Sequence, residues 1–505
     1  MTHTLARGTL LGLGLAVAVA EGSAAQGYRL SLDSRIQRVA FRGLQTDSIR
    51  ADSVLPGSPN GGPTTPGGVG VSCINGQRYC YFFDPGARQQ TAPATLTADL
   101  TMWGFGVRGL SLHTNVRGNA NAGNDLWPGM HPAIQLWEGY LDYSTPWFGI
   151  RAGRQTTTSR LGFAGFDGGR LQLRSRRFGL EAVGYGGWGL ARASALPVSS
   201  GTLNPLDEFQ PPVRNEIWGA IGSWSRGPGE LRFEWQREVD RATRFFQSER
   251  MALSGALRPI QHLSVAGGAE YNLAEGLWGS ADLAAQYSDR LVTASAGVRR
   301  YRPHFDLWTV WPAFSPVANT GVFGTAAVSP IRGVQIRGRA EHYRYDDADA
   351  STPLVSVRQD GERYSLGATV TRLARWTFDG GYSYEPGVGG TMWGWDASVG
   401  YQPVEPLTLR LYGATNIRGL EYRYEDSFTR WLGFDADWRL LDNVSVGASA
   451  IQLFEDRRRP DASGFSWSQT MLSAHVTVLL SSRSGDRLRL AKALKRMPSS
   501  KAVPK

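Results

Sequence analysis

Residues 334–341 read Val-Gln-Ile-Arg-Gly-Arg-Ala-Glu. Every second residue, Val334, Ile336, Gly338 and Ala340, is apolar or small, and the residues between them are Gln, Arg and Glu. Side chains on a β-strand point alternately to opposite faces, so this spacing predicts a strand with one apolar and one strongly charged face. Charged groups are costly to bury without partners, so the charged face should meet water.

The same alternation recurs along most of the chain, and it is equally clear in residues 231–236, 263–273 and 472–480. A soluble β-sandwich also alternates, but here Trp, Tyr and Phe gather near the segment ends of the apolar face. Segments of about ten residues with aromatic ends are typical of transmembrane β-barrels, whose outside meets lipid and whose lumen meets water. We therefore predict an all-β fold, a single antiparallel transmembrane β-barrel over residues 26–480, in the bacterial outer membrane.

Short turns alternate with longer connections, which is typical of outer-membrane barrels with short periplasmic turns and long outer loops. Ten hairpins plus a first and a last segment give 22 strands, and any even number from 16 to 22 is compatible with the segment boundaries. The short turns are predicted at 104–107, 144–147, 176–177, 225–229, 258–262, 289–290, 330–333, Ala374, 402–406 and Asp442.

The longest connection, residues 46–92, is predicted to be an outer loop that either narrows the lumen or covers its mouth. It is rich in Pro and Gly and contains Cys73 and Cys80. The tight-turn dipeptide Asn75-Gly76 between the two cysteines predicts a small disulfide-closed loop in an oxidising compartment. A shorter outer connection is predicted at residues 156–167.

The two ends of the chain differ from its body. Residues 1–25 contain an arginine, an apolar core and small residues suited to cleavage, which predicts a secretory signal peptide. Residues 481–505 hold eight Lys and Arg against Asp486, so much of the net charge of +10 lies in a periplasmic tail. Export makes nucleic acid an unsuitable partner. Anionic lipid or an acidic periplasmic protein would suit the tail, and a solvated tail without a partner is an equal alternative.

Other function classes receive no support. No apolar run of 18 residues occurs after the N-terminus, which excludes a helical membrane protein. Residues 104–109 match G-x-G-x-x-G, but a strand pattern follows instead of the helix that a dinucleotide site needs. The seven His are scattered without ligand spacing, so no metal and no cofactor are predicted. Ser111 and His113 share a lumen face, which we interpret as polar lining, and we predict no enzyme.

Charges on the predicted lumen face are the nearest thing to a functional signal in the sequence. Four arginines between residues 337 and 375 come from three successive strands and would form a basic ladder on one wall, with acidic residues of 138–142 and 435–437 nearer the seam. Opposed walls of opposite sign would sieve polar solutes. Alternatively, such residues only bridge neighbouring strands. The predicted pore-lining residues are Glu138, Asp142, Arg151, Arg170, Arg174, Arg337, Arg339, Arg363, Arg375, Arg410, Asp435 and Asp437.

One stretch, residues 136–173, resembles a known family. Its segments 138–142 (Glu-Gly-Tyr-Leu-Asp), 150–155 (Ile-Arg-Ala-Gly-Arg-Gln) and 166–171 (Phe-Asp-Gly-Gly-Arg-Leu) are similar to the strand, G-R-Q, loop and F-D-G-x-R-L pattern of alginate-export-type and related porin-like outer-membrane barrels. The resemblance implies a channel for an anionic polysaccharide or another polar solute. It also implies that the arginines at the matching positions line the conduit; these are Arg151, Arg154 and Arg170.

Taken together, these features predict a passive, porin-like outer-membrane channel for polar, anionic solutes or polysaccharide, surrounded by lipid and performing no covalent chemistry. A structural barrel that serves as scaffold or sheath for a partner protein is the alternative. A TonB-dependent receptor is disfavoured, because the strand pattern begins too early in the chain to leave room for a plug domain.

Overall fold

The computed structural model describes residues 27–56, 63–67, 69–74, 76–122, 133–190, 214–239, 246–302, 318–346, 360–387, 390–418, 427–457 and 467–482. The predicted signal peptide and nearly all of the predicted basic tail lie outside these residues. Within the described ranges, no helix is both long enough and apolar enough to cross a membrane.

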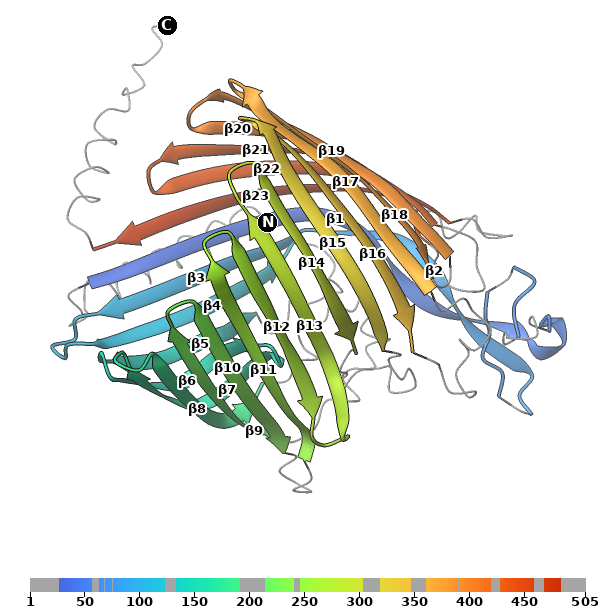
Figure 1. Cartoon of the computed structure of the whole chain (residues 1–505). Coiled ribbons are helices and arrows are strands. Elements are labelled where there is room, and N and C mark those ends of the chain that lie inside the picture. Colours follow the sequence, from blue (N-terminus) through green and yellow to red (C-terminus); the bar gives the residue numbers. More distant parts are fainter. Residues whose placement is uncertain are drawn as a thin grey trace, which may run out of the picture.

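The strands form one closed antiparallel ring (Figure 1). From β3 to β23 each strand pairs with the next along the chain, and β1 closes the ring between β23 and β3. Strand β2 precedes β3 with only Ala92 between them, and both pair with β1, so the wall has 22 strands. The predicted fold class and the predicted strand number are therefore confirmed.

The strands are long enough to cross a bilayer at a tilt. Their bounds are β1 Gly27–Arg50, β2 Tyr79–Thr91, β3 Pro93–Trp103, β4 Leu110–Asn121, β5 Ile134–Ser144, β6 Phe148–Ser159, β7 Gly162–Ser175, β8 Leu180–Gly189, β9 Glu216–Arg226, β10 Gly229–Val239, β11 Phe246–Ile260, β12 Leu263–Asn272, β13 Leu277–Ser288, β14 Val292–Tyr301, β15 Asn319–Ile331, β16 Val334–Tyr345, β17 Asp360–Leu373, β18 Trp376–Gly387, β19 Gly390–Val404, β20 Leu407–Arg418, β21 Ser427–Leu441, β22 Val444–Arg457 and β23 Trp467–Ser481.

Each of the ten predicted short turns lies between two successive strands. The β13–β14 turn shows why the local sequence is enough to predict a turn. The Asp289 carboxylate accepts hydrogen bonds from the backbone N–H groups of Leu291 (2.7 Å) and Val292 (2.8 Å), and these donors hold the pKa of Asp289 below its ordinary value. In the β7–β8 turn Gly179 has φ +65°, and a Cβ there would meet the Ser225 carbonyl oxygen at 2.1 Å, so the turn requires glycine.

The stretch predicted as the longest outer loop contains more strand than expected. Residues 44–50 of β1 pair with 79–85 of β2, which extends the β1 hairpin as a two-stranded ribbon. The triplet Asp84-Pro85-Gly86 suggests a turn in the sequence, but it lies at a register shift in this ladder, where a bulge absorbs it. A disulfide joins Cys73 and Cys80 at the end of the ribbon.

The second stretch predicted as a loop, residues 156–167, is also mostly strand. Ser159 pairs with Gly162, so β6 and β7 are joined by the two residues Arg160 and Leu161. Gly162 has φ +109°, a backbone conformation that favours glycine. The three successive threonines at 156–158 explain the extension, because β-branched residues favour strands.

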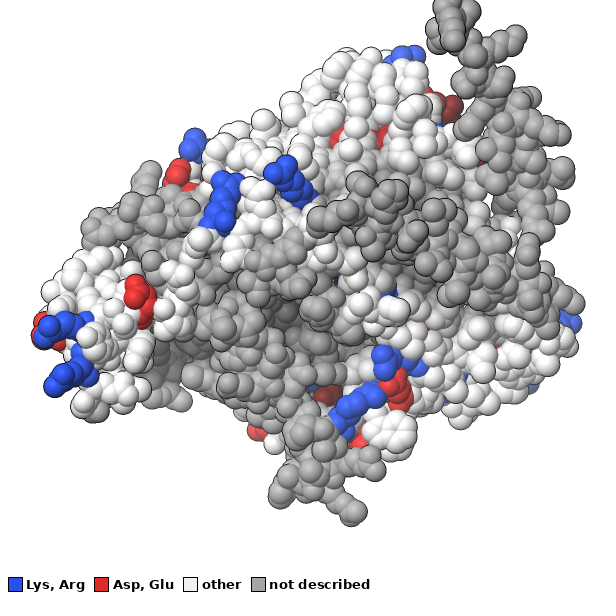
Figure 2. All heavy atoms as spheres, turned by 180° about the vertical axis from the view of Figure 1, so that it is seen from behind, with Lys and Arg blue, Asp and Glu red and all other residues white. Residues whose placement is uncertain are grey.

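The two faces of the wall differ as the alternation predicts. On β10, Leu231 and Phe233 are exposed to the outside at 48% and 44%, whereas Glu234 on the opposite face is 2% exposed. Figure 2 shows few charged side chains among the uncharged residues of the described wall on the side in view. The outside of the barrel is thus apolar enough for lipid, and the lumen is polar and charged.

Candidate functional site

The distal half of the β6–β7 hairpin curls into the lumen. Gln155 and Phe166 face each other across the two strands, and both are fully buried. The Phe166 ring stacks on Tyr185 of β8 with 5.3 Å between ring centroids. Val183 of β8 belongs to the same apolar cluster, together with residues 217 and 221 of β9. These partners occupy the lumen faces of β8 and β9, so the hairpin lies against the inside of the wall.

Sequence reasoning missed this arrangement, although a signal was present. On most strands only the outer face is apolar, but β9 has Ile217 and Ile221 on one face and Trp218 and Trp224 on the other. A strand that is apolar on both faces must be covered on both sides. Lipid covers the tryptophans, and the hairpin covers the isoleucines.

Acidic residues of β5 connect the wall to the base of the hairpin. Glu138 accepts a hydrogen bond from Thr156 of β6, and its other carboxylate oxygen lies 3.2 Å from Nε2 of His113. Nδ1 of His113 lies 3.1 Å from the Thr101 hydroxyl. The Ser111 hydroxyl donates instead to a backbone carbonyl of β5, so Ser111 and His113 do not form a hydrolase pair.

Three of the predicted lining arginines lie together on the lumen side of β6 and β7. Arg151 pairs with Asp142 at 3.0 Å, and Arg174 lies 3.7 Å from Glu181. Arg170 is the register partner of Arg151, so two like charges face each other across the strands. Among the described residues, Arg170 has no carboxylate within ion-pair distance. Its charge is therefore not matched by a direct ion pair within the described part of the chain.

The predicted basic ladder is neutralised within the wall. Arg337 of β16 donates to Asp379 of β18 at 2.9 Å and to the Thr369 hydroxyl of β17 at 2.7 Å. Arg375 lies in the turn between β17 and β18, where it donates to the Pro403 carbonyl near the end of β19. Placing Arg375 on a strand was wrong by one residue, because the turn takes up Ala374 and Arg375.

The Glu341 carboxylate of β16 lies among three arginines in the same part of the wall. The side chain of Glu341 is fully buried and pairs with Arg339 at 2.7 Å, with Arg363 at 3.6 Å and with Arg299 of β14. Arg363 also pairs with Glu385 of β18 at 2.8 Å. This network joins residues of the four strands β14, β16, β17 and β18, so these arginines bridge strands, as the structural alternative expects, and still border the lumen.

The remaining predicted residues lie on β20 and β21. Arg410 donates to the Ser398 hydroxyl at 3.3 Å and lies over the Tyr412 ring, 5.4 Å from its centroid, with no carboxylate partner in the described ranges. Asp435 accepts from the Tyr412 hydroxyl at 2.8 Å. Asp437 lies 3.3 Å from His475 of β23, close to the seam, where the sequence placed it.

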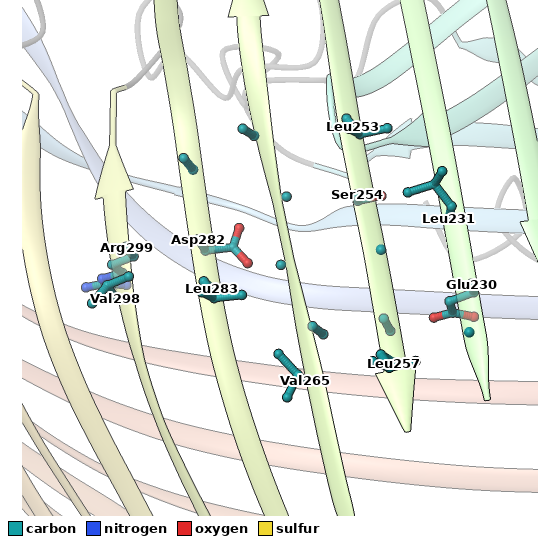
Figure 3. A pocket seen from close by; sticks show the side chains of 18 of the residues that line it. Glu230, Leu231, Leu253, Ser254, Leu257, Val265, Asp282, Leu283, Val298 and Arg299 are labelled. Carbon is teal, nitrogen blue, oxygen red and sulfur yellow. The ribbon is translucent and has the colours of Figure 1, made fainter. Parts of the chain in front are cut away.

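A hollow in the wall at β10–β14 is lined mainly by apolar side chains, among them Leu231, Leu253 and Leu283 (Figure 3). These leucines are the exposed residues of the outer face. The hollow therefore faces lipid and is not part of the lumen. No group of three or more His, Cys, Asp or Glu residues suited to a metal ion occurs in the described part of the chain.

No protein-family model matches the chain, and no curated protein does. The resemblance to alginate-export-type barrels is therefore not supported. A solved structure of a ferric enterobactin receptor variant from Pseudomonas aeruginosa (PfeA), in complex with enterobactin, is similar with a TM-score of 0.50 and 12% identity. The similarity covers 89% of this chain and 81% of the receptor.

Two further solved structures align with the chain at lower TM-scores. Pseudomonas aeruginosa OpdQ has a TM-score of 0.38 and 10% identity, covering 90% of this chain and 98% of OpdQ. Acinetobacter baumannii OccAB2 has a TM-score of 0.40 and 10% identity, and the similarity covers 92% of this chain and 100% of OccAB2. At these identities the similarities bear on the fold alone. The closed ring with its apolar exterior is a β-barrel of the bacterial outer membrane.

Proposed function

We propose that the barrel is a passive channel for small polar solutes, with a preference for anions. The observation that carries the proposal is the closed ring of 22 strands whose charged side chains face inward. So many ions on one face require water or partners, and a continuous row of them along a closed wall favours an aqueous path.

The anion preference rests on the balance of paired and unpaired lumen charges. Most lumen arginines pair with wall carboxylates, such as Arg337 with Asp379, and contribute little net field. Arg170 makes no such pair within the described residues and faces Arg151, so its charge acts on ions in the lumen. Arg410 lies opposite the Asp435 carboxylate across β20 and β21 and adds less net charge. Small solutes are favoured over a polysaccharide chain, because the β6–β7 hairpin occupies part of the lumen.

Planar lipid bilayers test the proposal with the mature protein. Insertion should give stepwise conductance, and a salt gradient across the bilayer should give a reversal potential of the sign expected for anion preference. A barrel that inserts without conducting would contradict the channel. If such a non-conducting barrel also copurified with a stoichiometric partner protein, a scaffold function would replace the channel function.

A further inference from the structure

Arg160, at the tip of the β6–β7 hairpin, is bound to three wall strands. Its backbone N–H donates to the Glu234 carboxylate of β10 at 2.7 Å. Its guanidinium donates to the Gly268 carbonyl of β12 at 3.0 Å and to the Asp282 carboxylate of β13. Its Nε lies 3.6 Å from the Glu270 carboxylate of β12. A single residue thus fixes the tip against strands that are 74 to 122 positions away in the sequence.

These contacts lie in a partly desolvated place. The side chains of Arg160 and Glu270 are 20% and 18% exposed, and Leu161 beside Arg160 is buried. Charge-assisted hydrogen bonds are stronger where water is partly excluded than at an open surface. The guanidinium also matches several acceptors at once, which a single ammonium cannot do.

The base of the hairpin is held by different residues. Thr156 donates to Glu138 of β5, and Arg154 donates to the Leu136 carbonyl at 2.8 Å. Arg154 also pairs with Asp167 across the hairpin at 2.7 Å. Loss of the Arg160 contacts would therefore release the tip while the base stays attached to the wall.

We propose that Arg160 sets the size limit of the lumen by fastening the tip of the hairpin inside it to strands β10, β12 and β13, and this inference rests on the proposed channel function. Arg160 acts as a positioning residue, because it holds the hairpin in place. Its removal has two consequences. The released tip leaves a wider path, and the carboxylates of Glu270 and Asp282 lose a positive partner, which moves ion selectivity toward cations.

Proteoliposomes with the mature protein test this role through the uptake of uncharged sugars of increasing size. Arg160→Gln should admit sugars that the wild type excludes and should shift the reversal potential toward cations. Arg160→Lys keeps the charge and should restore most of the wild-type selectivity and part of the size limit. The matched control is Arg430→Gln, which removes a pair with Asp456 at 3.3 Å in which both side chains are more than half exposed, and it should behave as the wild type.

The outcomes separate the two proposals. If the wild type admits no sugar and carries no current, the channel function fails and Arg160 is not at issue. If the wild type conducts and folded Arg160→Gln keeps the same size limit, the role of Arg160 is overturned. Should Arg160→Gln not fold, Asp282→Ala removes one acceptor of the Arg160 guanidinium from the wall side and should raise the size limit to a smaller extent. An unchanged limit in that variant would equally overturn the role.

Discussion

At the scale of single residues, the described lumen face carries many ion pairs, together with side chains such as Arg170 and Asp435 that make no ion pair with another described residue. The Glu341 carboxylate is fully buried and is held by three arginines, 299, 339 and 363. A carboxylate without water needs such partners, since an unpaired buried charge is costly. Arg170 is the opposite case, a half-buried cation that faces Arg151.

Neutralising Glu341 tests the buried pair. Glu341→Gln should lower the free energy of unfolding by about 3 kcal/mol, because the neighbouring arginines lose their shared counter-charge. It should also increase anion preference. Urea unfolding in lipid vesicles and the reversal potential measure both effects. Glu405→Gln is the control, since the Glu405 side chain is 89% exposed and should contribute little. Equal stability of the two variants would contradict the assignment.

Removing the charge of Arg170 tests the unpaired cation. Arg170→Gln should move the reversal potential toward cations without destabilising the barrel, because the substitution relieves repulsion from Arg151 and leaves no carboxylate unpaired. Arg170→Lys should retain the wild-type selectivity. A reversal potential that stays at the wild-type value in Arg170→Gln would show that this side chain does not act on permeating ions.

At the scale of elements, turns follow from local sequence and the inward hairpin does not. Gly, Pro, Asn or Asp fix turn geometry within four residues, which makes most of the short turns predictable. The β17–β18 turn is an exception, because it consists of Ala374 and Arg375, and Ala374 adopts a positive φ of 31°. The β6–β7 segment alternates as a strand whether it stands upright or curls inward, so its path depends on partners far away in the sequence. Phe166 and Arg160 find theirs on β8 and on β10–β13, and no local pattern specifies those contacts.

The β13–β14 turn should be sensitive to acid. The pKa of Asp289 is lowered by two backbone donors, so its contribution to stability is complete above the ordinary carboxyl pKa and is lost as the pH falls through the lowered pKa. Asp289→Ala should unfold at lower urea than the wild type at neutral pH, and the two midpoints should converge in acid. Asp289→Asn is the control, because its amide oxygen still accepts hydrogen bonds but does not titrate, so its contribution should not be lost in acid. A wild-type advantage over Asp289→Ala that persists in acid would refute this account.

Packing under the hairpin should protect its tip from protease. Phe166→Ala should cost about 3–5 kcal/mol of local packing, because it removes a fully buried ring. The loosened tip should then be cut by trypsin after Arg160, which mass spectrometry can identify. Phe163→Ala, on the exposed face of the same hairpin, is the matched control and should remain uncut. Resistance of Phe166→Ala to trypsin would mean that the cluster does not hold the hairpin.

At the scale of the whole molecule, alternation and turn spacing were enough to predict a closed barrel with 22 strands. The alternation of polar and apolar residues shows that each strand has one face toward water and one apolar face. Closure of the sheet into a ring leaves no strand edge with unpaired backbone groups in lipid. The pattern could place Arg337, Arg339 and Arg363 on one wall. It could not show that Asp379, Glu341 and Glu385 neutralise them, since pairing depends on register between strands.

Two neighbouring residues of β20 offer the most direct test of a barrel whose lumen meets water and whose outside meets lipid. Arg410 faces the lumen and Leu411 the exterior, and the chain's two native cysteines are joined in a disulfide, so an introduced thiol has no background. Each is replaced by Cys, and the current is recorded while a charged, membrane-impermeant thiol reagent is added. We expect Arg410→Cys to react and lose current, and Leu411→Cys to stay unmodified with its current unchanged. Reaction at Leu411→Cys but not at Arg410→Cys would contradict the account.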